Sequence, residues 1–290
     1  MIDYEVVDMF ADRPLTGCAL GVVADAAGLS DPAMAAVARE IGTSETAFVL
    51  PPTAPAATHR VRVFTPHGES PFGGHSAVGT ACALVRAGTL PEGRVVQQCG
   101  DRLLPVDATA RTAELTATGP LETTPFDAAD LAAACDLPTD ELTALAAAAG
   151  FGPAFHYLPA HSSSLQLAGA HPERDAWNDR ADLFAFTWDQ AARTARARMF
   201  APGYRMPEDP ACASAALGLG VWLVSVGWLP TTDGRHRYRV RQGVEMGRPS
   251  TLDCRVDVED GRVVEAAVSG VVLPAAHGRM VSPDPAAVPA

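Results

Sequence analysis

The chain has 290 residues, of which 48% are hydrophobic and 19% are charged, a balance typical of a folded globular protein. This length supports a sizeable core and about two domains. The formal net charge is −12, and the sequence contains no run of basic residues. A surface that binds nucleic acid or an anionic membrane is therefore not expected.

All 22 basic residues are arginines, so the chain contains no lysine. A Schiff base requires a lysine amine, and a P-loop requires a lysine that binds phosphate. The composition therefore excludes a pyridoxal-phosphate enzyme with its own internal aldimine, a lysine-dependent aldolase and a P-loop nucleotide-binding protein.

The cysteines do not form a metal or redox motif. None of the six belongs to a C-x-x-C pair, which argues against a zinc site and against a dithiol active site. The chain begins with a strand-like segment and no signal peptide is recognisable, so we expect a cytoplasmic protein with reduced thiols and no bound metal.

In chain order, β-branched and aromatic residues predict a first strand over residues 2–10. Asp31 and Pro32 predict the start of a helix that runs to Ile41, with Asp31 as the N-cap. A second, apolar helix is predicted over residues 74–87. Further strands are predicted over residues 46–50, 58–65, 94–98, 103–106 and 113–117.

The segment 119–125 contains Pro, Thr and Gly without periodicity and predicts a linker, so the expected domains are 1–118 and 119–274. Residues 275–290 are rich in Pro and Ala and predict a loose tail, which can pack on the N-terminal half. Within the second domain, helices are predicted over 127–135, 140–149 and 211–226. Strands are predicted over 155–158, 164–167, 197–201, 237–241, 252–258 and 263–273.

The segment 211–229 carries no charge and is nearly long enough to span a bilayer. Three glycines interrupt it, and Glu208 and Asp209 precede it. A helix that is apolar on all sides is also what the centre of a large soluble fold requires. We therefore predict a buried central helix.

The two apolar helices belong to a weak internal repeat. Each follows a strand that ends in Phe-x-Pro and then an acidic residue, a proline and a turn of small residues, as at Glu69-Ser70-Pro71 and Glu208-Asp209-Pro210. This pattern predicts two similarly built halves. Small residues at a helix start let the backbone N–H groups approach a carboxylate closely.

Three polar residues are candidates for chemistry. Glu45 precedes a predicted strand, His75 lies at the start of the first apolar helix, and Asp209 lies before the second. Taken singly, they are equally compatible with a surface glutamate, a structural histidine and a helix cap assisted by Ser214. If they converge, they form a site for general acid/base catalysis on an anionic substrate.

Four sequence blocks resemble the signature blocks of the phenazine-biosynthesis isomerase (PhzF-like) family. They are Ser44-Glu45-Thr46-Ala47-Phe48, Arg62-Val63-Phe64-Thr65-Pro66 with Glu69-Ser70-Pro71-Phe72-Gly73-Gly74-His75, Glu208-Asp209-Pro210-Ala211-Cys212-Ala213-Ser214-Ala215, and Gln242-Gly243-Val244-Glu245-Met246-Gly247-Arg248-Pro249-Ser250. The blocks occur in the family's order, and the resemblance covers residues 2–273.

This resemblance implies the diaminopimelate-epimerase-like fold, an α+β architecture. In this fold two similar domains each wrap a curled, mostly antiparallel sheet or barrel around a central helix. The resemblance also implies an active site to which both domains contribute, no cofactor, a small carboxylate-bearing substrate and usually a homodimer.

Residue matching places Glu45 on the family's catalytic acid/base and places His75 and Asp209 on its supporting polar residues. The helix-start positions that hold the substrate's carboxylate fall on Gly74, His75, Ala213 and Ser214. Further candidates for substrate binding are Cys18, Gly73 and Cys212.

The sequence departs from the family pattern at three positions. Cys18 stands where the family commonly has the Asn of Gly-Asn-Pro, and Ala213 stands where it commonly has Gly. The epimerase relatives use two cysteines, whereas here Cys212 matches one of them and Gly73 the other. A two-thiol racemase is therefore disfavoured, a Glu45–Cys212 pair remains conceivable, and a structural role for Cys212 is favoured.

The sequence thus predicts a cofactor-independent isomerase that shifts a proton, and with it a double bond, on a cyclic or unsaturated amino-acid-derived metabolite. Such chemistry fits specialised metabolism such as antibiotic biosynthesis. An amino-acid epimerase or racemase is the first alternative, and a non-catalytic carboxylate-binding relative is the second.

Overall fold

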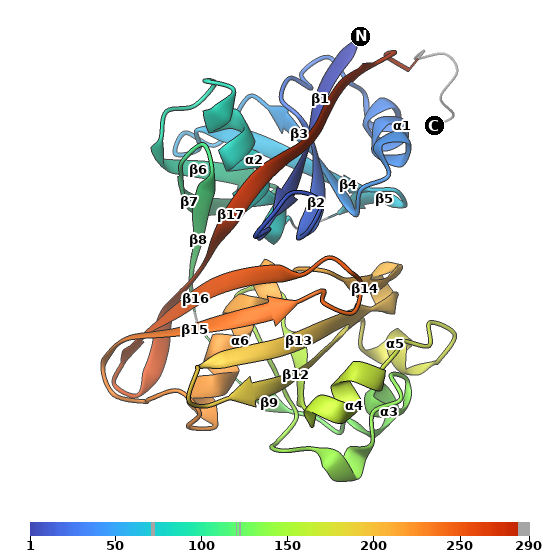
Figure 1. Ribbon diagram of the computed structural model, residues 1–290. Helices are drawn as coiled ribbons and strands as arrows, with labels where there is room; N and C mark the ends of the chain where they lie inside the picture. Colours follow the sequence, from blue (N-terminus) through green and yellow to red (C-terminus); the bar gives the residue numbers. More distant parts are fainter. Residues whose placement is uncertain (71–72, 120, 122, 284–290) are drawn as a thin grey trace. The chain divides into compact units, whose positions relative to one another are not determined.

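A computed structural model describes residues 1–70, 73–119, 121 and 123–283 (Figure 1). The chain divides into unit 1, which comprises Met1–Leu115 and the chain from Ser269 onward, and unit 2, which comprises Thr116–Val268. The polypeptide passes between the units within two strands, β8 (Thr112–Thr118) and β17 (Arg262–Met280). The segment expected to be the linker therefore begins where β8 ends.

In unit 1 eight strands close into a mixed barrel. Pairings run from β8 through β7, β6, β4, β3, β2 and β1 to β17, and β17 pairs with β8. The pairs β2–β3 and β4–β6 are parallel, whereas the pairs β1–β2, β1–β17, β3–β4, β6–β7 and β7–β8 are antiparallel, so the barrel is mixed but still mostly antiparallel, as predicted. The strands not yet bounded are β1 (Ile2–Met9), β2 (Cys18–Val23), β3 (Glu45–Leu50), β4 (His59–Thr65), β5 (Gly68–Ser70), β6 (Gly93–Cys99) and β7 (Arg102–Ala108).

The predicted loose tail is partly wrong, because Ala275–Met280 continues β17. Ile2 pairs with Met280 and Val6 with Ala276, antiparallel. Without this partner β1 would expose a row of unpaired backbone groups, so the barrel uses the end of the chain to satisfy them. The rest of the expected tail, residues 284–290, lies outside the described residues.

The helix α2 (Gly74–Arg86) lies inside the barrel of unit 1. Its residues Ala77, Val78, Ala81 and Cys82 are completely buried, because these small side chains let the helix fit among the strands. The helix α1 (Asp31–Ile41) packs Met34, Val37 and Ala38 against Phe48 and Phe64. Its N-cap is Ser30, whose hydroxyl accepts from the amide of Ala33, and not Asp31 as predicted.

Unit 2 repeats the order of pairing found in unit 1. The parallel pairs β2–β3 and β4–β6 correspond to β11–β12 and β13–β15, and the hairpin β4–β5 before α2 corresponds to β13–β14 before α6. The predicted internal repeat is thus present in the topology. The strands of unit 2 are β9 (Thr124–Pro125), β10 (Ala147–Ala149), β11 (Phe155–Pro159), β12 (Leu183–Asp189), β13 (Thr194–Ala201), β14 (Met206–Asp209), β15 (Gly234–Gln242) and β16 (Ser250–Glu259).

The helix α6 (Ala213–Ser225) is the buried central helix that the sequence predicts, since every residue from Ala213 to Val224 is buried. Tyr157 donates to the carbonyl of Ala215 at 2.7 Å and Tyr238 to that of Ala216 at 2.6 Å. Gly218 and Gly220 leave the space that these two tyrosine rings occupy. Within the described chain, no helix is long and apolar enough to cross a membrane.

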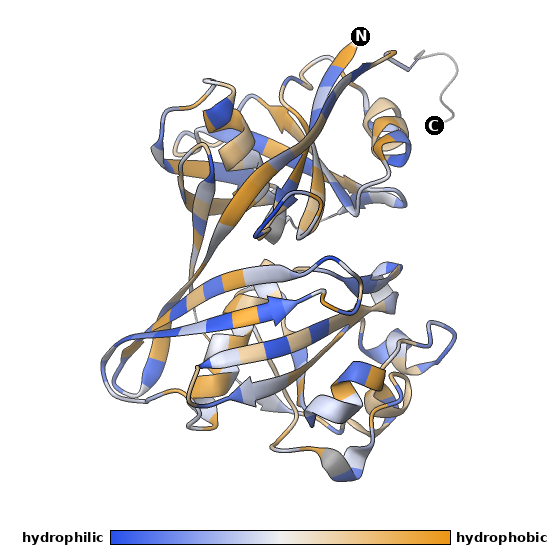
Figure 2. Cartoon of the chain, viewed as in Figure 1, coloured by the Kyte–Doolittle hydropathy of each residue, from blue (hydrophilic) through white to orange (hydrophobic). Residues whose placement is uncertain are grey.

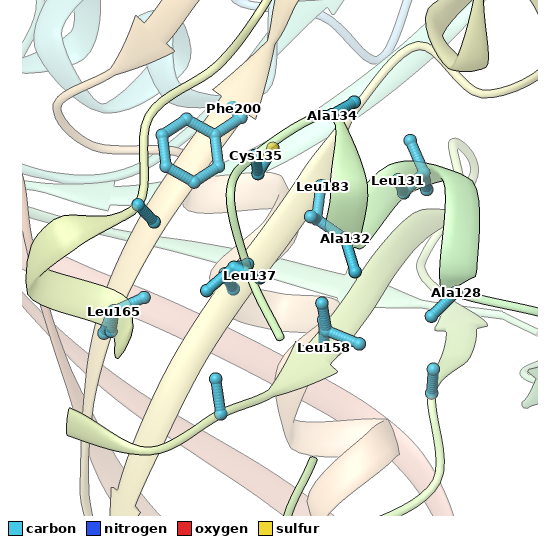
Figure 3. Close-up of a cluster of buried hydrophobic side chains, with 14 of the residues drawn as sticks. Ala128, Leu131, Ala132, Ala134, Cys135, Leu137, Leu158, Leu165, Leu183 and Phe200 are labelled. Carbon is cyan, nitrogen blue, oxygen red and sulfur yellow. The ribbon is translucent and has the colours of Figure 1, made fainter. Parts of the chain in front are cut away.

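Besides the residues around α6, unit 2 has a second hydrophobic core, shown in Figure 3. It includes Leu131, Leu137, Leu158, Leu165, Leu183 and Phe200. It packs beneath short helices: α3 (Ala129–Ala133), η1 (Thr139–Glu141), α4 (Ser162–Leu167) and α5 (Ala176–Asp179), with η2 (Pro202–Tyr204) nearby in the chain. Two predictions are wrong here. The segment 140–149 is a turn followed by β10, which pairs with β9 and β11, and 164–167 belongs to α4. Alanine runs and short apolar stretches do not fix the type of element.

Candidate functional site

Glu45 lies at the first position of β3, where the backbone is held by Thr43. The Thr43 hydroxyl donates to the carbonyl of Glu45 at 2.7 Å and accepts from the amide of Gly21 at 3.2 Å. Leu20 on β2 pairs with Glu45. The Glu45 side chain is only 7% exposed, so a carboxyl group is fixed in a largely dry position at the end of the barrel.

Cys18 lies at the same corner as Glu45. Its sulfur lies 3.7 Å from the Ser44 hydroxyl, and that hydroxyl donates to the carbonyl of Ala19 at 3.4 Å. The structure therefore brings Cys18 to the residue before Glu45. The Cys18 side chain is completely buried.

The start of α2 is built from glycines. Gly73 is the N-cap, and no side chain among the described residues caps the helix there. A Cβ at position 73 would collide with Val63 and Ser76, so a cysteine does not fit where the two-thiol relatives have one. Gly74 is buried and begins the helix. His75 is the second helical residue; its side chain, like Pro71 and Phe72, lies outside what the structure describes.

Cys99, which the sequence analysis did not select, connects Glu45 to the start of α2. Burial raises the pKa of the Cys99 thiol, a hydrogen bond with the backbone of Gly73 lowers it, and the carboxylates of Glu45 and Glu69 raise it. The Cys99 thiol is thus close enough to interact with both the backbone of Gly73 and the carboxylate of Glu45. Unit 1 therefore presents a buried carboxyl, a buried thiol and an uncapped helix N-terminus together.

In unit 2, Asp209 ends β14 and its carboxylate accepts from the amide of Ala211 at 2.9 Å. The alternative role of Asp209 as a cap of α6 is not realised, because this bond closes a turn before the helix and Cys212 is the N-cap. Cys212, Ala213 and Ser214 are all buried. The N-cap side chain makes no capping hydrogen bond, so Ser214 does not assist a cap either.

Gln242, another residue missed by the sequence analysis, fixes the turn that leads into α6. Its completely buried amide donates to the carbonyl of Asp209 at 2.6 Å and accepts from the amide of Cys212 at 3.4 Å. Gly243 follows with φ of 71°, and a Cβ there would meet the carbonyls of Arg248 and Pro210. These contacts explain why a Gln-Gly pair accompanies this half of the site.

A matching arginine–glutamate pair holds the hairpin before each central helix. Arg62 binds Glu69 through two hydrogen bonds of 2.7 and 2.6 Å and lies over the Phe64 ring. Arg198 binds Glu208 in the same manner, with bonds of 2.9 and 2.7 Å. Each pair ties the strand before the turn to the strand that leads into the helix start.

The candidate residues therefore form two sets of the same design, one in each unit. Glu45, Gly73 and Gly74 belong to unit 1 with Cys18, and Asp209, Cys212, Ala213 and Ser214 belong to unit 2. Throughout the described residues, no three His, Cys, Asp or Glu side chains gather as ligands for a metal would.

Comparison with known proteins decides the family. The profile of the phenazine biosynthesis-like proteins matches residues 7–278, nearly the whole chain. The chain belongs to this family. It is an isomerase of the PhzF type, as the resemblance of its four sequence blocks implied.

Two curated relatives cover almost the full length of this PhzF-like isomerase. A trans-2,3-dihydro-3-hydroxyanthranilate isomerase of Pseudomonas aeruginosa is 33% identical over 295 residues, which covers 95% of this chain and 98% of that protein. An uncharacterised isomerase of Mesorhizobium japonicum is 32% identical over 306 residues, which covers 96% of this chain and 98% of that protein.

Solved structures show the same fold. A PhzF-family protein of Bacillus anthracis superimposes with a TM-score of 0.84 at 22% identity and covers 97% of this chain and 99% of its own. A hydroxyproline epimerase of Agrobacterium vitis superimposes with a TM-score of 0.64 at 13% identity, and the match covers 98% of this chain and 92% of the epimerase. The PhzF-like isomerase thus has an α+β fold that these racemase-type enzymes share.

Two of the missed features of this PhzF-like isomerase left a signal in the sequence. Arg-x-Phe occurs at the same place in both halves of the internal repeat, at Arg62 and Arg198, each followed by the glutamate that it binds. Gln242 opens the fourth block. Cys99 left none, because its proximity to Glu45 depends on the path of β6.

Proposed function

We propose that this PhzF-like isomerase moves a proton between two carbons of a small, cyclic or unsaturated, carboxylate-bearing metabolite derived from an amino acid. Glu45 is the single acid/base, and no cofactor takes part. Support comes from the burial of Glu45, from the uncapped start of α2, and from Cys99, whose thiol is hydrogen-bonded to the backbone of Gly73 and influenced by the charge of Glu45. The relative at 33% identity is an isomerase of trans-2,3-dihydro-3-hydroxyanthranilate, which makes that compound the first substrate to test.

The proposed reaction conserves every atom and electron. The Glu45 carboxylate accepts a proton from one carbon, and the electron pair of that C–H bond shifts across the adjacent double bond. The far carbon then takes a proton from the Glu45 carboxyl group, either the same one or a solvent proton that has exchanged with it. One carboxyl can serve both steps when both carbons present the same face, and positioned acid/base catalysis of this type contributes about 10²–10⁴ in rate.

Substrate binding is assigned to the helix starts. The backbone N–H groups of the first turn of α2 and of α6 attract the carboxylate, because the positive end of a helix dipole lies there. We assign His75 and Asp209 to supporting roles and Gly74, Ala213 and Ser214 to carboxylate binding. Ala213 keeps the small size that this role requires, although it adds a methyl group to the family's usual glycine.

A two-thiol epimerase is the weaker candidate. It requires a second cysteine opposite Cys212, and position 73 has no space for one. The proposal also extends to a homodimeric, cytoplasmic enzyme of specialised metabolism, which rests on the family alone.

Proton NMR in D₂O tests the proposal. We expect the wild-type protein to convert trans-2,3-dihydro-3-hydroxyanthranilate with deuterium at a new carbon and a shifted double bond, and Glu45→Gln to lose at least about 10²-fold in rate. Glu40→Gln, which changes an exposed glutamate of α1, is the matched control. Full turnover by Glu45→Gln would overturn the assignment of Glu45. Exchange at a single α-carbon with inversion would favour the epimerase.

A further inference from the structure

Unit 2 contains a cavity of about 740 Å³ that shares no residue with the candidate site. It lies on the outer face of the sheet, over β12, β13 and β15, which are adjacent in Figure 1. The volume falls in the range of sites for small molecules. The lining residues that define its chemistry are Arg196, Arg239, Arg241, Trp188, Trp228 and Asp189.

Strand register places the arginines side by side. Arg196 on β13 pairs with Arg241 on β15, and Arg239 pairs with Thr194. Along β15, Tyr238 and Val240 are buried, so the alternating arginines all face outward. Figure 2 shows β15 and β13 banded in alternating hydrophilic and hydrophobic segments. In a chain of net charge −12, this cavity concentrates three positive charges against the single carboxylate of Asp189.

Part of this positive charge is not neutralised. Arg196 pairs with Glu245 at 2.6 Å, and Arg239 pairs with Asp253 at 2.7 Å. Arg241 makes no ion pair or side-chain hydrogen bond with any described residue, and the buried Nε of Arg196 likewise has no hydrogen-bond partner among them. The Arg196 Nε is covered from solvent, whereas the exposed guanidinium of Arg241 has donors available for an anion.

The carboxylate of Asp189 does not fill this need. Its oxygen Oδ1 accepts from the amides of Ala191 and Ala192, both at 2.9 Å, and so stabilises the turn between β12 and β13. No acceptor for Arg241 is found among the described residues, so water or a ligand supplies it.

The two indoles of the cavity are held in place. Trp188 donates to Gln190 at 2.7 Å, and Gln190 donates to the carbonyl of Trp228 at 3.0 Å. The Trp228 ring packs edge-on against Trp222, with ring centres 5.1 Å apart and an angle of 81°. Preformed aromatic surfaces beside cations bind planar rings with little loss of side-chain entropy.

We propose that this cavity is a second ligand site, which binds a small planar aromatic carboxylate. Arg241 binds the carboxylate group, and the indoles of Trp188 and Trp228 contact the ring. The inference does not depend on the proposed isomerase reaction.

The cavity is separate from the half of the candidate site that lies in unit 2. Ala213 begins α6, whereas Trp228 follows its end, and a helix of 13 residues is about 20 Å long. Arg241 and Gln242 are neighbours on β15 but face opposite sides of the sheet: Gln242 is buried against the Asp209 turn and Arg241 is exposed. A ligand on Arg241 therefore leaves the start of α6 unoccupied.

Indole N–H resonances locate binding, since the chain has four tryptophans and two line the cavity. The probe is 2-naphthoate, with neutral 2-naphthylmethanol and saturated cyclohexanecarboxylate as comparison compounds, and Trp188→Phe and Trp228→Phe assign the signals. We expect 2-naphthoate to shift the signals of Trp188 and Trp228 but not those of Trp177 and Trp222, and both comparison compounds to bind more weakly.

Two arginine variants form the decisive pair. Arg241→Gln should weaken 2-naphthoate binding by about tenfold or more, the usual effect of losing a hydrogen bond to a charged group. Arg237→Gln should leave it unchanged. Arg237 is also exposed on β15 and forms no ion pair with another described residue, but it does not line the cavity. Glu45→Gln should also bind normally.

Three outcomes would overturn the proposal. The first is the absence of shifts at Trp188 and Trp228 with millimolar 2-naphthoate, and the second is an equal loss of affinity in both arginine variants, which would indicate general charge attraction. The third is a change of oligomeric state in Arg241→Gln by sedimentation velocity, which would show that a second copy of the chain covers this face.

Discussion

The guanidinium of Arg198 binds both carboxylate oxygens of Glu208 with the same geometry as Arg62 binds those of Glu69, but in a drier setting. The side chains of Arg198 and Glu208 are 9% and 14% exposed, whereas those of Arg62 and Glu69 are 24% and 44% exposed. Arg198 also donates to the carbonyls of Leu165 and Ala168 and lies over the Phe200 ring. The same bidentate contact with a glutamate, in settings of unequal burial, should give unequal contributions to stability.

Replacement of Arg198 should therefore cost far more than replacement of Arg62. Arg198→Met leaves a buried carboxylate without its partner, so we expect a loss of about 3 kcal/mol in the free energy of unfolding. Arg62→Met should cost about 1 kcal/mol or less, because water solvates the two exposed carboxylates that it leaves, those of Glu69 and Asp31. Urea unfolding followed by circular dichroism measures both values. Equal losses would show that burial does not control the strength of these pairs.

Replacement of the Cys212 thiol should leave the proposed reaction largely intact. Cys212 supplies backbone geometry at the start of α6, and serine preserves the size of the side chain. We expect Cys212→Ser to reduce the rate of deuterium incorporation by less than about tenfold, well below the loss expected for Glu45→Gln. If the two variants lose exchange equally, thiol-dependent epimerisation becomes the better description.

A methyl group at position 73 should destabilise unit 1. Val63 and Ser76 occupy the space beside Gly73, and Val63 is completely buried, so Gly73→Ala requires the β4–α2 contact to move. We expect a loss of about 1–3 kcal/mol in the free energy of unfolding, the usual cost of overpacking.

Gly28→Ala is the matched control for this substitution, because a Cβ at position 28 meets no atom within 4 Å. It should change the free energy of unfolding by less than about 0.5 kcal/mol. A Gly73→Ala protein as stable as Gly28→Ala would mean that the α2 start has room for a side chain, and would revive the two-thiol alternative.

His59 should make stability depend on pH. Burial lowers the pKa of His59 below its ordinary value of 6.5, while the hydrogen bond with Gln97 partly opposes this. The unfolded chain therefore binds more protons than the folded one below pH 6.5. The stabilisation from neutral His59 is complete above pH 6.5 and is lost as pH falls from 6.5 toward the lower pKa of the folded state.

The His59 contribution can be isolated by comparing slopes. We expect the free energy of unfolding to fall below pH 6.5 by up to about 1.4 kcal/mol per pH unit from this residue. His59→Gln should flatten that slope, and His67→Gln, at an exposed position, should retain it. An unchanged slope in His59→Gln would assign the pH dependence to other groups.

The sequence by itself determined the family, the two-part repeat and the central helices. Runs of small apolar residues are sufficient to predict α2 and α6, because only side chains of that size let strands close around a helix. The four blocks were sufficient for the family because each places several residues at fixed spacing. Glu45 at a strand start was likewise readable from its neighbours in the chain.

The tertiary structure decided features that depend on distant partners. Ala275–Met280 is a strand only because β1 lies beside it, and Ala147–Ala149 is a strand only because β9 and β11 flank it. The charge of Glu45 acts on the Cys99 thiol, and Gln242 donates to the carbonyl of Asp209, across segments far apart in the sequence. The local sequence pattern cannot predict such contacts. It indicates the conformational preference of a segment, but not which distant backbone groups or side chains will form hydrogen bonds with that segment.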